Sequence, residues 1–226
     1  MTFVRRQKGV AKYLLYDKIG RLLRPYCLNK LERRRLKNHD FTIFSQNCIG
    51  SIMYHDLGAK FLSPTINMKF NPNDWIKFLA DIRYYLDAPI SFCKDNRYSY
   101  PIGYIGDCFV EFVHYSSENE VIQKWEERKS RINWNNFFVI SCDKDMTINS
   151  VKKYYQLHKR MGGHFIMFVS ENTYLQLTDE EIDSGIYIKQ RFFPDGSDAK
   201  LLNFASIFGH RYYNYCFDYI KFLNNG

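Results

Sequence analysis

Short hydrophobic runs alternate along this chain with longer segments in which hydrophobic residues recur at helical spacing. Runs typical of buried strands occupy 41–44, 107–114, 136–141 and 164–169, with shorter candidates at 90–93 and 185–189. Between them, Trp75, Phe78 and Ile82 share one face of a helix expected from Asn71 to just before Pro89. Strands that alternate with helices predict an α/β fold, with a mostly parallel sheet and helices on both of its faces.

Capping residues and turns set the predicted limits of several elements. Ser117 opens a helix that runs to about Ile132, and Thr147 caps the helix that follows the strand at 136–141. A last helix is predicted over 212–223. Segments 100–106 and 192–202 are rich in Gly and Pro and predict loops.

The first 39 residues differ from the rest of the chain in charge. They contain 12 Lys and Arg but two acids, a net charge of +10, whereas residues 40–226 contain 20 basic and 22 acidic residues. We therefore divide the chain into a basic arm, 1–39, and a single α/β domain, 40–226. The nearly neutral domain argues against a nucleic-acid-binding core.

The arm has the pattern of a basic amphipathic helix. Leu15, Ile19, Leu22 and Tyr26 form an apolar stripe among Lys and Arg, and Pro25 is expected to interrupt the helix. Such a helix can lie on an anionic membrane, or its stripe can pack on the domain or on a second subunit. Binding of nucleic acid by the arm is the least favoured alternative.

Composition predicts a cytoplasmic protein, and the arm is a candidate for peripheral contact with the inner face of the plasma membrane. No hydrophobic run approaches the ~20 residues of a membrane-spanning helix, and no signal peptide is visible after Met1. The six cysteines are scattered without a C-x-x-C pair, so reduced thiols are expected.

The stretch 41–50, FTIFSQNCIG, predicts a strand that leads through a polar turn into a helix over 49–57. Backbone N–H groups converge at such a turn, and the helix dipole favours negative charge. Ser45, Asn47 and Cys48 are therefore candidates to bind a phosphate or a sugar hydroxyl. Cys48 is also a candidate nucleophile, because helix N-termini favour thiolates, although no His at a fixed spacing supports it. A polar turn around a half-buried cysteine is the alternative.

Three polar residues accompany the predicted strand at 107–114. Asp107, Glu111 and His114 are candidates for a catalytic base, or for polar core groups whose hydrogen bonds are satisfied. Strand alternation puts both acids on one face and His114 on the other, unless the strand is bulged or His114 lies beyond its end.

Two further candidates concern metal and phosphate. Asp143 and Asp145 follow a buried strand, as in sugar-nucleotide transferases that bind Mg or Mn, although Asp-x-Asp is also an ordinary loop sequence. Arg128 shares a helix stripe with Val121 and Trp125, so it needs an anion. That anion is either a carboxylate such as Glu111 or the diphosphate of a ligand.

Six segments in order resemble a bacterial family catalogued as domain of unknown function nineteen-nineteen, over roughly 33–170. They are Ser45–Gly50, Ser63–Asn67, Tyr100–Gly103, Gly106–Asp107, His114–Tyr115 and Lys124–Asn133. Members are often labelled exopolysaccharide biosynthesis proteins, and the resemblance implies a Rossmann-like, three-layer fold and a role in that pathway. It implies no catalytic residues. Ile49 and Ser51 stand where the family usually has Trp and Gly.

These observations lead to hypotheses of different classes. The first is a glycosyl- or other group-transferase acting on a sugar nucleotide or lipid-linked sugar. In it, Asn47 and Arg128 bind phosphate, Asp143 and Asp145 hold a metal, and Glu111 or Asp107 is the base. The second is a non-catalytic polysaccharide-binding or scaffold protein, and the third a Cys48-dependent acyltransferase or hydrolase. The sequence does not name the sugar, the acceptor or the oligomeric state.

Overall fold

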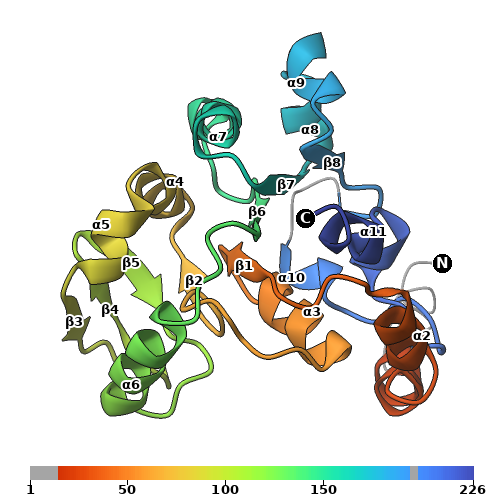
Figure 1. Cartoon of the computed structure of the whole chain (residues 1–226), viewed down its shortest axis with the longest axis horizontal. Helices are drawn as coiled ribbons and strands as arrows, with labels where there is room; N and C mark the ends of the chain where they lie inside the picture. Colours follow the sequence, from red (N-terminus) through yellow and green to blue (C-terminus); the bar gives the residue numbers. More distant parts are fainter. Residues whose placement is uncertain (1–14, 194–197) are drawn as a thin grey trace, which may run out of the picture.

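The computed structural model describes residues 15–193 and 198–226, which form two four-stranded sheets and the helices around them (Figure 1). The first sheet is parallel throughout, in the order β1-β6-β7-β8. Its strands are β1 Thr42–Ser45, β6 Phe137–Cys142, β7 His164–Val169 and β8 Tyr187–Lys189. This parallel sheet, with its flanking helices, confirms the predicted α/β fold.

Both faces of the parallel sheet are covered by helices. Alternation along β1 sends Phe44 into one core cluster and Ile43 into the other. The Phe44 side packs against α4 Pro72–Ala80 and α7 Ile148–Met161. The Ile43 side packs against α3 Ile49–Leu57, α10 Asp198–Leu201, η1 Tyr212–Tyr215 and α11 Tyr219–Leu223. Two short helices, α8 Glu171–Tyr174 and α9 Asp179–Asp183, connect β7 to β8.

The second sheet is antiparallel, in the order β2-β5-β4-β3, and the sequence did not predict it as a separate sheet. Its strands are β2 Lys69–Phe70, β3 Ile90–Cys93, β4 Ile102–Ile105 and β5 Cys108–Glu111, and α5 Ile82–Asp87 and α6 Glu118–Lys129 pack against it. The predicted loop at 100–106 was wrong, because it contains β4. Gly103 permits this pairing, since a Cβ there would lie 2.0 Å from the Ser91 carbonyl oxygen.

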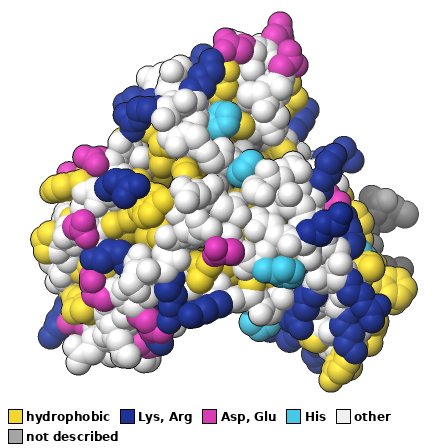
Figure 2. Space-filling view, viewed as in Figure 1, with side chains coloured by type: hydrophobic (Ala, Val, Ile, Leu, Met, Phe, Trp, Pro, Cys, Tyr) yellow, Lys and Arg dark blue, Asp and Glu magenta, His cyan; other side chains and the backbone are white. Residues whose placement is uncertain are grey.

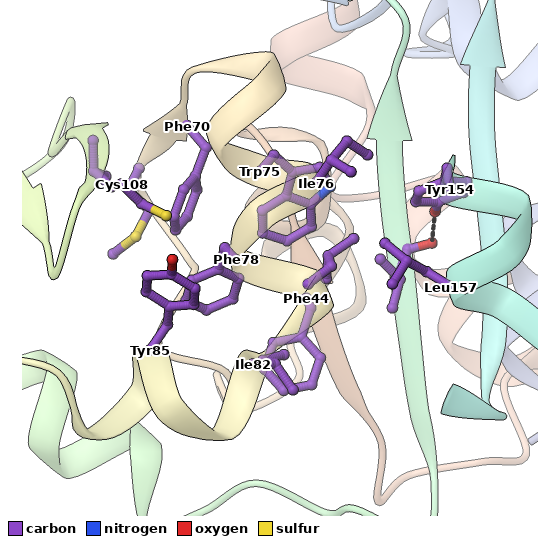
Figure 3. Packing of buried hydrophobic residues seen from close by; sticks show 14 of the residues in the cluster. Phe44, Phe70, Trp75, Ile76, Phe78, Ile82, Tyr85, Cys108, Tyr154 and Leu157 are labelled. Atoms are coloured by element: carbon purple, nitrogen blue, oxygen red, sulfur yellow. Dashed lines mark hydrogen bonds between the residues drawn. The ribbon is translucent and has the colours of Figure 1, made fainter. Parts of the chain in front are cut away.

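Helix α4 joins the two sheets (Figure 3). Trp75 is fully buried and donates from Nε1 to Ser141 Oγ of β6 at 2.7 Å. On its other side, the Trp75 ring stacks on Phe78 and lies 5.1 Å from the ring of Phe70 in β2. The relative position of the two sheets therefore depends on this helix.

Three predicted elements differ in extent from those observed. The helix expected from Asn71 to before Pro89 is divided at Asp81, whose side chain caps α5. The strand expected over 107–114 ends at Glu111. The helix expected over 212–223 is a 3-10 turn followed by α11, which starts after the N-cap Asp218. The first and third differences occur where an Asp side chain accepts the N–H of a residue three positions later, Tyr84 for Asp81 and Lys221 for Asp218.

The described part of the arm is a helical segment, 15–23, followed by α2 Leu28–Arg35. Pro25 lies in the turn between them, as predicted; residues 1–14 lie outside the described residues. Arg24 is buried and ion-pairs with Glu32 and Asp56, both at 2.8 Å, and donates to the Gly209 carbonyl oxygen at 2.6 Å. This network attaches the arm to the domain.

Candidate functional site

Side chains of the polar turn after β1 cap helix α3. Ser45 Oγ accepts the Gly50 N–H at 3.1 Å, and Asn47 Oδ1 accepts the Ile49 N–H at 3.1 Å. The N–H groups of Ile49 and Gly50, which were predicted to be available to a phosphate, therefore already have hydrogen-bond acceptors within the chain. Gly50 allows the helix to approach the strand, since a Cβ there would lie 2.7 Å from Ser45 Cβ. Ligand binding by Ser45 and Asn47 stays a prediction.

Cys48, the N-cap residue of α3, contacts a histidine that is 66 residues away in the sequence. Its Sγ lies 3.4 Å from Nε2 of His114. His114 is exposed because β5 ends at Glu111, three residues earlier, and Cys48 is half-buried. Among the described residues, no carboxylate is hydrogen-bonded to Nδ1 of His114. The two side chains form a thiol–imidazole dyad in which the imidazole is exposed.

The dyad lies where the two sheets meet. Cys48 follows β1 of the parallel sheet, whereas His114 follows β5 of the antiparallel sheet. Backbone hydrogen bonds hold this junction: the Phe70 N–H donates to the Gln46 carbonyl oxygen at 2.9 Å, and the His114 N–H donates to the Asn67 carbonyl oxygen at 3.4 Å. The geometry of the dyad therefore depends on how the sheets are joined.

Glu111, Lys69 and Tyr100 form a polar group beside the dyad. Glu111 Oε1 pairs with Lys69 Nζ at 3.2 Å, and Oε2 accepts the Tyr100 hydroxyl at 2.8 Å. Burial and the hydrogen-bonded Glu111 carboxylate raise the pKa of Tyr100 to about 12, with smaller contributions from Tyr98 and Cys48. Tyr100 is therefore a protonated hydrogen-bond donor at neutral pH.

A surface hollow of about 590 Å³ adjoins Tyr100. Its lining combines the ring of Tyr98, which meets Tyr100 edge to face, with polar side chains such as Asn96, Asn119 and Ser116. Tyrosine rings with amide and hydroxyl groups are suited to a sugar. The tyrosine clusters that the sequence singled out, Tyr84-Tyr85 and 212–215, lie outside this lining.

The structure separates Asp107 from Glu111 and His114. Asp107 lies before the start of β5 and Glu111 at its end, so most of the strand lies between the two carboxylates. Asp107 is largely exposed, accepts the Tyr85 hydroxyl at 2.8 Å and pairs with Lys77 at 3.1 Å. These two contacts, that of Tyr85 first, lower the pKa of Asp107. Its contacts are those of a surface ion pair away from the dyad.

Asp143 and Asp145 bind different partners. Asp143 is buried, and its Oδ2 accepts both the N–H and the hydroxyl of Ser170 at 2.8 Å. Asp145 is exposed, has a positive φ of 62° and pairs with Lys144 at 2.8 Å. In the described part of the chain, no three His, Cys, Asp or Glu side chains are grouped to hold a metal ion. The metal site stays a prediction.

Arg128 is buried on α6, as the helix stripe predicted, but Glu111 is not its partner. Its Nη1 donates to the Ile66 carbonyl oxygen at 3.2 Å and to the Tyr115 hydroxyl at 2.8 Å. The carboxylate expected to neutralise it binds Lys69 and Tyr100 instead. The prediction that a carboxylate such as Glu111 pairs with Arg128 was therefore wrong.

The comparisons with known proteins agree with the motifs. A family model described as Domain of unknown function (DUF1919) matches residues 19–224. The chain belongs to this family. The match extends beyond the resemblance at 33–170 to part of the arm and the C-terminal helices. An uncharacterized protein of Haemophilus influenzae is 31% identical over 201 residues, 88% of this chain and 92% of the relative. Neither description states a reaction.

In this DUF1919 protein, sequence reasoning named both members of the dyad but did not pair them. Cys48 was selected for its place at a helix start, and His114 for its place on a strand. Strand alternation separated His114 from the acids unless it lay beyond the strand end, and in the structure it does lie beyond the end of β5. Tyr100 and Lys69 were not selected, because a tyrosine in a loop and a surface lysine carry no distinguishing pattern.

Proposed function

We propose that this protein is a thiol-dependent group transferase in which Cys48 is the nucleophile and His114 its proton acceptor. The observation that supports it most is the distance of 3.4 Å between Cys48 Sγ and His114 Nε2. Cysteine nucleophiles are activated by an adjacent base or by a helix N-terminus, and both features meet at Cys48.

The reaction class is acyl transfer. The Cys48 thiol gives its proton to His114 as sulfur attacks the carbonyl carbon of an acyl donor. The bond from that carbon to the leaving oxygen or sulfur breaks, and His114 returns the proton to the departing atom. A hydroxyl then attacks the thioester, its proton passes through His114 to the Cys48 sulfur, and the ester is released.

The acceptor that the surroundings favour is a saccharide. The hollow beside Tyr100 offers two tyrosine rings and both neutral and charged hydrogen-bonding groups, and Tyr100 connects it to Glu111 beside the dyad. The resemblance to proteins labelled for exopolysaccharide biosynthesis supports this choice, and the acceptor hydroxyl would belong to a sugar nucleotide or a lipid-linked sugar. Transfer to water, which makes the protein a hydrolase, uses the same steps.

A metal-dependent glycosyltransferase is the second candidate. It is favoured by Asp143, whose Oδ1 is buried without a hydrogen-bond partner among the described residues. The same hypothesis also needs Asp145 as a second metal ligand and Glu111 or Asp107 as the base. Asp145 pairs with Lys144, Glu111 with Lys69, and Asp107 with Lys77, so we place this candidate after the thiol mechanism.

The test is the rate at which each cysteine reacts with iodoacetamide at neutral pH, followed by peptide mass spectrometry. A free thiol is only a few per cent thiolate at this pH, so Cys48 paired with His114 should react roughly ten-fold faster than exposed Cys27 and Cys93. His114→Gln should remove this advantage and leave the rate of Cys27 unchanged. p-Nitrophenyl acetate should leave an acetyl group on Cys48.

The exposure of the other cysteines provides an internal control for the reaction rates. Cys27 and Cys93 are more exposed than Cys48, so accessibility alone predicts the opposite order of rates. Equal rates in the wild type and His114→Gln, with no acetyl adduct, would refute the thiol mechanism. The non-catalytic binding or scaffold protein would then be the better description.

The proposal includes a contact between the arm and an anionic membrane. Leu15, Leu22 and Tyr26 are 51%, 65% and 66% exposed, so these three residues do not pack on the domain. Lys and Arg side chains gather with hydrophobic ones over α2 (Figure 2). A second copy would bring two arms of net charge +10 together, whereas anionic lipid attracts them. No helix of membrane-spanning length and hydrophobicity occurs in the described residues.

We expect the protein to float with phosphatidylglycerol vesicles at low salt and to remain unbound with phosphatidylcholine vesicles. Leu22→Glu places a charge in the apolar stripe and should weaken flotation roughly ten-fold. Leu175→Glu is the matched control, because Leu175 is 73% exposed and lies next to α8. Salt-insensitive binding, or equal losses in both variants, would count against a membrane contact of the arm.

A further inference from the structure

A second hollow, lined mainly by cationic side chains, shares no lining residue with the hollow at Tyr100. It has a volume of about 290 Å³ and lies between α6 and the segment 59–61. Its charged lining residues are Lys60, Lys124, Arg128 and Arg131, against the single acid Glu127. Four cations and one carboxylate give the hollow a net charge of +3.

Arg128 distinguishes this hollow from an ordinary basic surface, because its guanidinium is buried. It is only 6% exposed, and its hydrogen-bond acceptors are neutral, the Ile66 carbonyl oxygen and the Tyr115 hydroxyl. Within 15–193 and 198–226, no carboxylate lies within ion-pair distance of it. A buried guanidinium without a counterion is costly, and an anion removes that cost.

The remaining charges are divided unequally around the hollow. Glu127 pairs with both Lys124 and Arg131, and the contact with Lys124 is the main cause of its lowered pKa. Lys60, on the rim, has no carboxylate partner in the described part of the chain. Glu127 therefore ion-pairs on one side, whereas Lys60 and Arg128 have no ion-pair partner among the described residues. Glu120, whose hydrogen bonds are with Ser116, attracts Arg128 only from a longer distance.

The geometry points to a phosphate group as the occupant: we propose that this hollow binds the phosphate or diphosphate of a ligand. Only Nη1 of Arg128 is hydrogen-bonded to the described residues, so its remaining N–H groups are available to phosphate oxygens. The ring of Phe61, 5.2 Å from the guanidinium, holds Arg128 in place by a cation–π contact. This site does not depend on the chemistry at Cys48.

The test is calorimetric titration of the full chain with inorganic phosphate and with pyrophosphate. We expect saturable binding, tighter for pyrophosphate, that Lys60→Gln weakens several-fold. Arg128→Lys keeps the charge but loses the planar fork, and should weaken binding about ten-fold. Lys153→Gln is the matched control, since Lys153 is exposed on α7, away from α6 (Figure 1). Cys48→Ala should bind as the wild type does, which separates this site from the proposed reaction.

Two results would overturn the proposal. One is the absence of saturable binding of either anion. The other is an equal loss of affinity in Lys60→Gln and Lys153→Gln, which would reveal attraction by net charge alone. Because Lys60 is exposed, its variant remains informative even if Arg128→Lys is unstable. Titration with glucose 1-phosphate and with uridine diphosphate then identifies the kind of ligand that carries the phosphate. Tighter binding of glucose 1-phosphate than of inorganic phosphate indicates a sugar phosphate, and tighter binding of uridine diphosphate than of pyrophosphate indicates a nucleotide.

Discussion

Replacing Trp75 by Ala is expected to lower the free energy of unfolding by about 3–5 kcal/mol, the usual loss when a large buried aromatic side chain is removed. Trp75 is inaccessible to solvent and packs on Phe70 and Phe78 between the two sheets. Urea unfolding followed by circular dichroism measures the loss. A decrease below about 1 kcal/mol would mean that α4 does not hold the two sheets together as the packing indicates.

A milder substitution separates packing from the hydrogen bond. Trp75→Phe keeps a ring but leaves Ser141 Oγ without its donor, which should cost about 1–3 kcal/mol. Adding Ser141→Ala should recover part of that loss, because it removes the acceptor that has lost the Trp75 donor, although the contact of Ser141 with Tyr154 is lost as well. The dyad joins the two sheets, so we also expect Trp75→Phe to reduce the alkylation rate of Cys48 more than that of Cys27.

Removing the charge of Arg24 is expected to cost about 3–5 kcal/mol, because Arg24→Met leaves Glu32 and Asp56 as buried carboxylates without this cation. Tyr219 also donates to Glu32 at 2.6 Å, so the loss reaches α11. For a chain of this length, the melting temperature should fall on the order of 10 °C. Differential scanning calorimetry measures it directly.

Arg21→Met is the matched control for Arg24→Met. Arg21 pairs with Asp17 at 3.1 Å, but its side chain is 73% exposed, so the pair should contribute less than about 1 kcal/mol. The double variant Arg24→Met/Glu32→Leu should be more stable than Arg24→Met, since it removes one unpaired acid. Similar melting temperatures for Arg24→Met and Arg21→Met would contradict a structural role for the buried network.

The two sheets differ in how far they could be predicted. Each strand of the parallel sheet is a hydrophobic run followed by a capped helix or a turn, and those signals lie within a few residues of one another. No strand of the antiparallel sheet has more than four residues, against six in β6 and β7, and β4 contains Gly103, which by itself indicates a turn. The need for glycine at position 103 becomes apparent only once β3 is in place, because a Cβ there would lie 2.0 Å from the Ser91 carbonyl oxygen.

By itself, the sequence determined the α/β class, the caps of the main helices, the polar turn after β1 and the buried position of Arg128. These depend on hydrogen bonds and hydrophobic spacing within one or two turns of chain. Only the tertiary structure decided that Cys48 meets His114, that Glu111 binds Lys69 rather than Arg128, and that Arg24 is buried. Those contacts join residues far apart in the chain, and their formation depends on how the two sheets pack against α4.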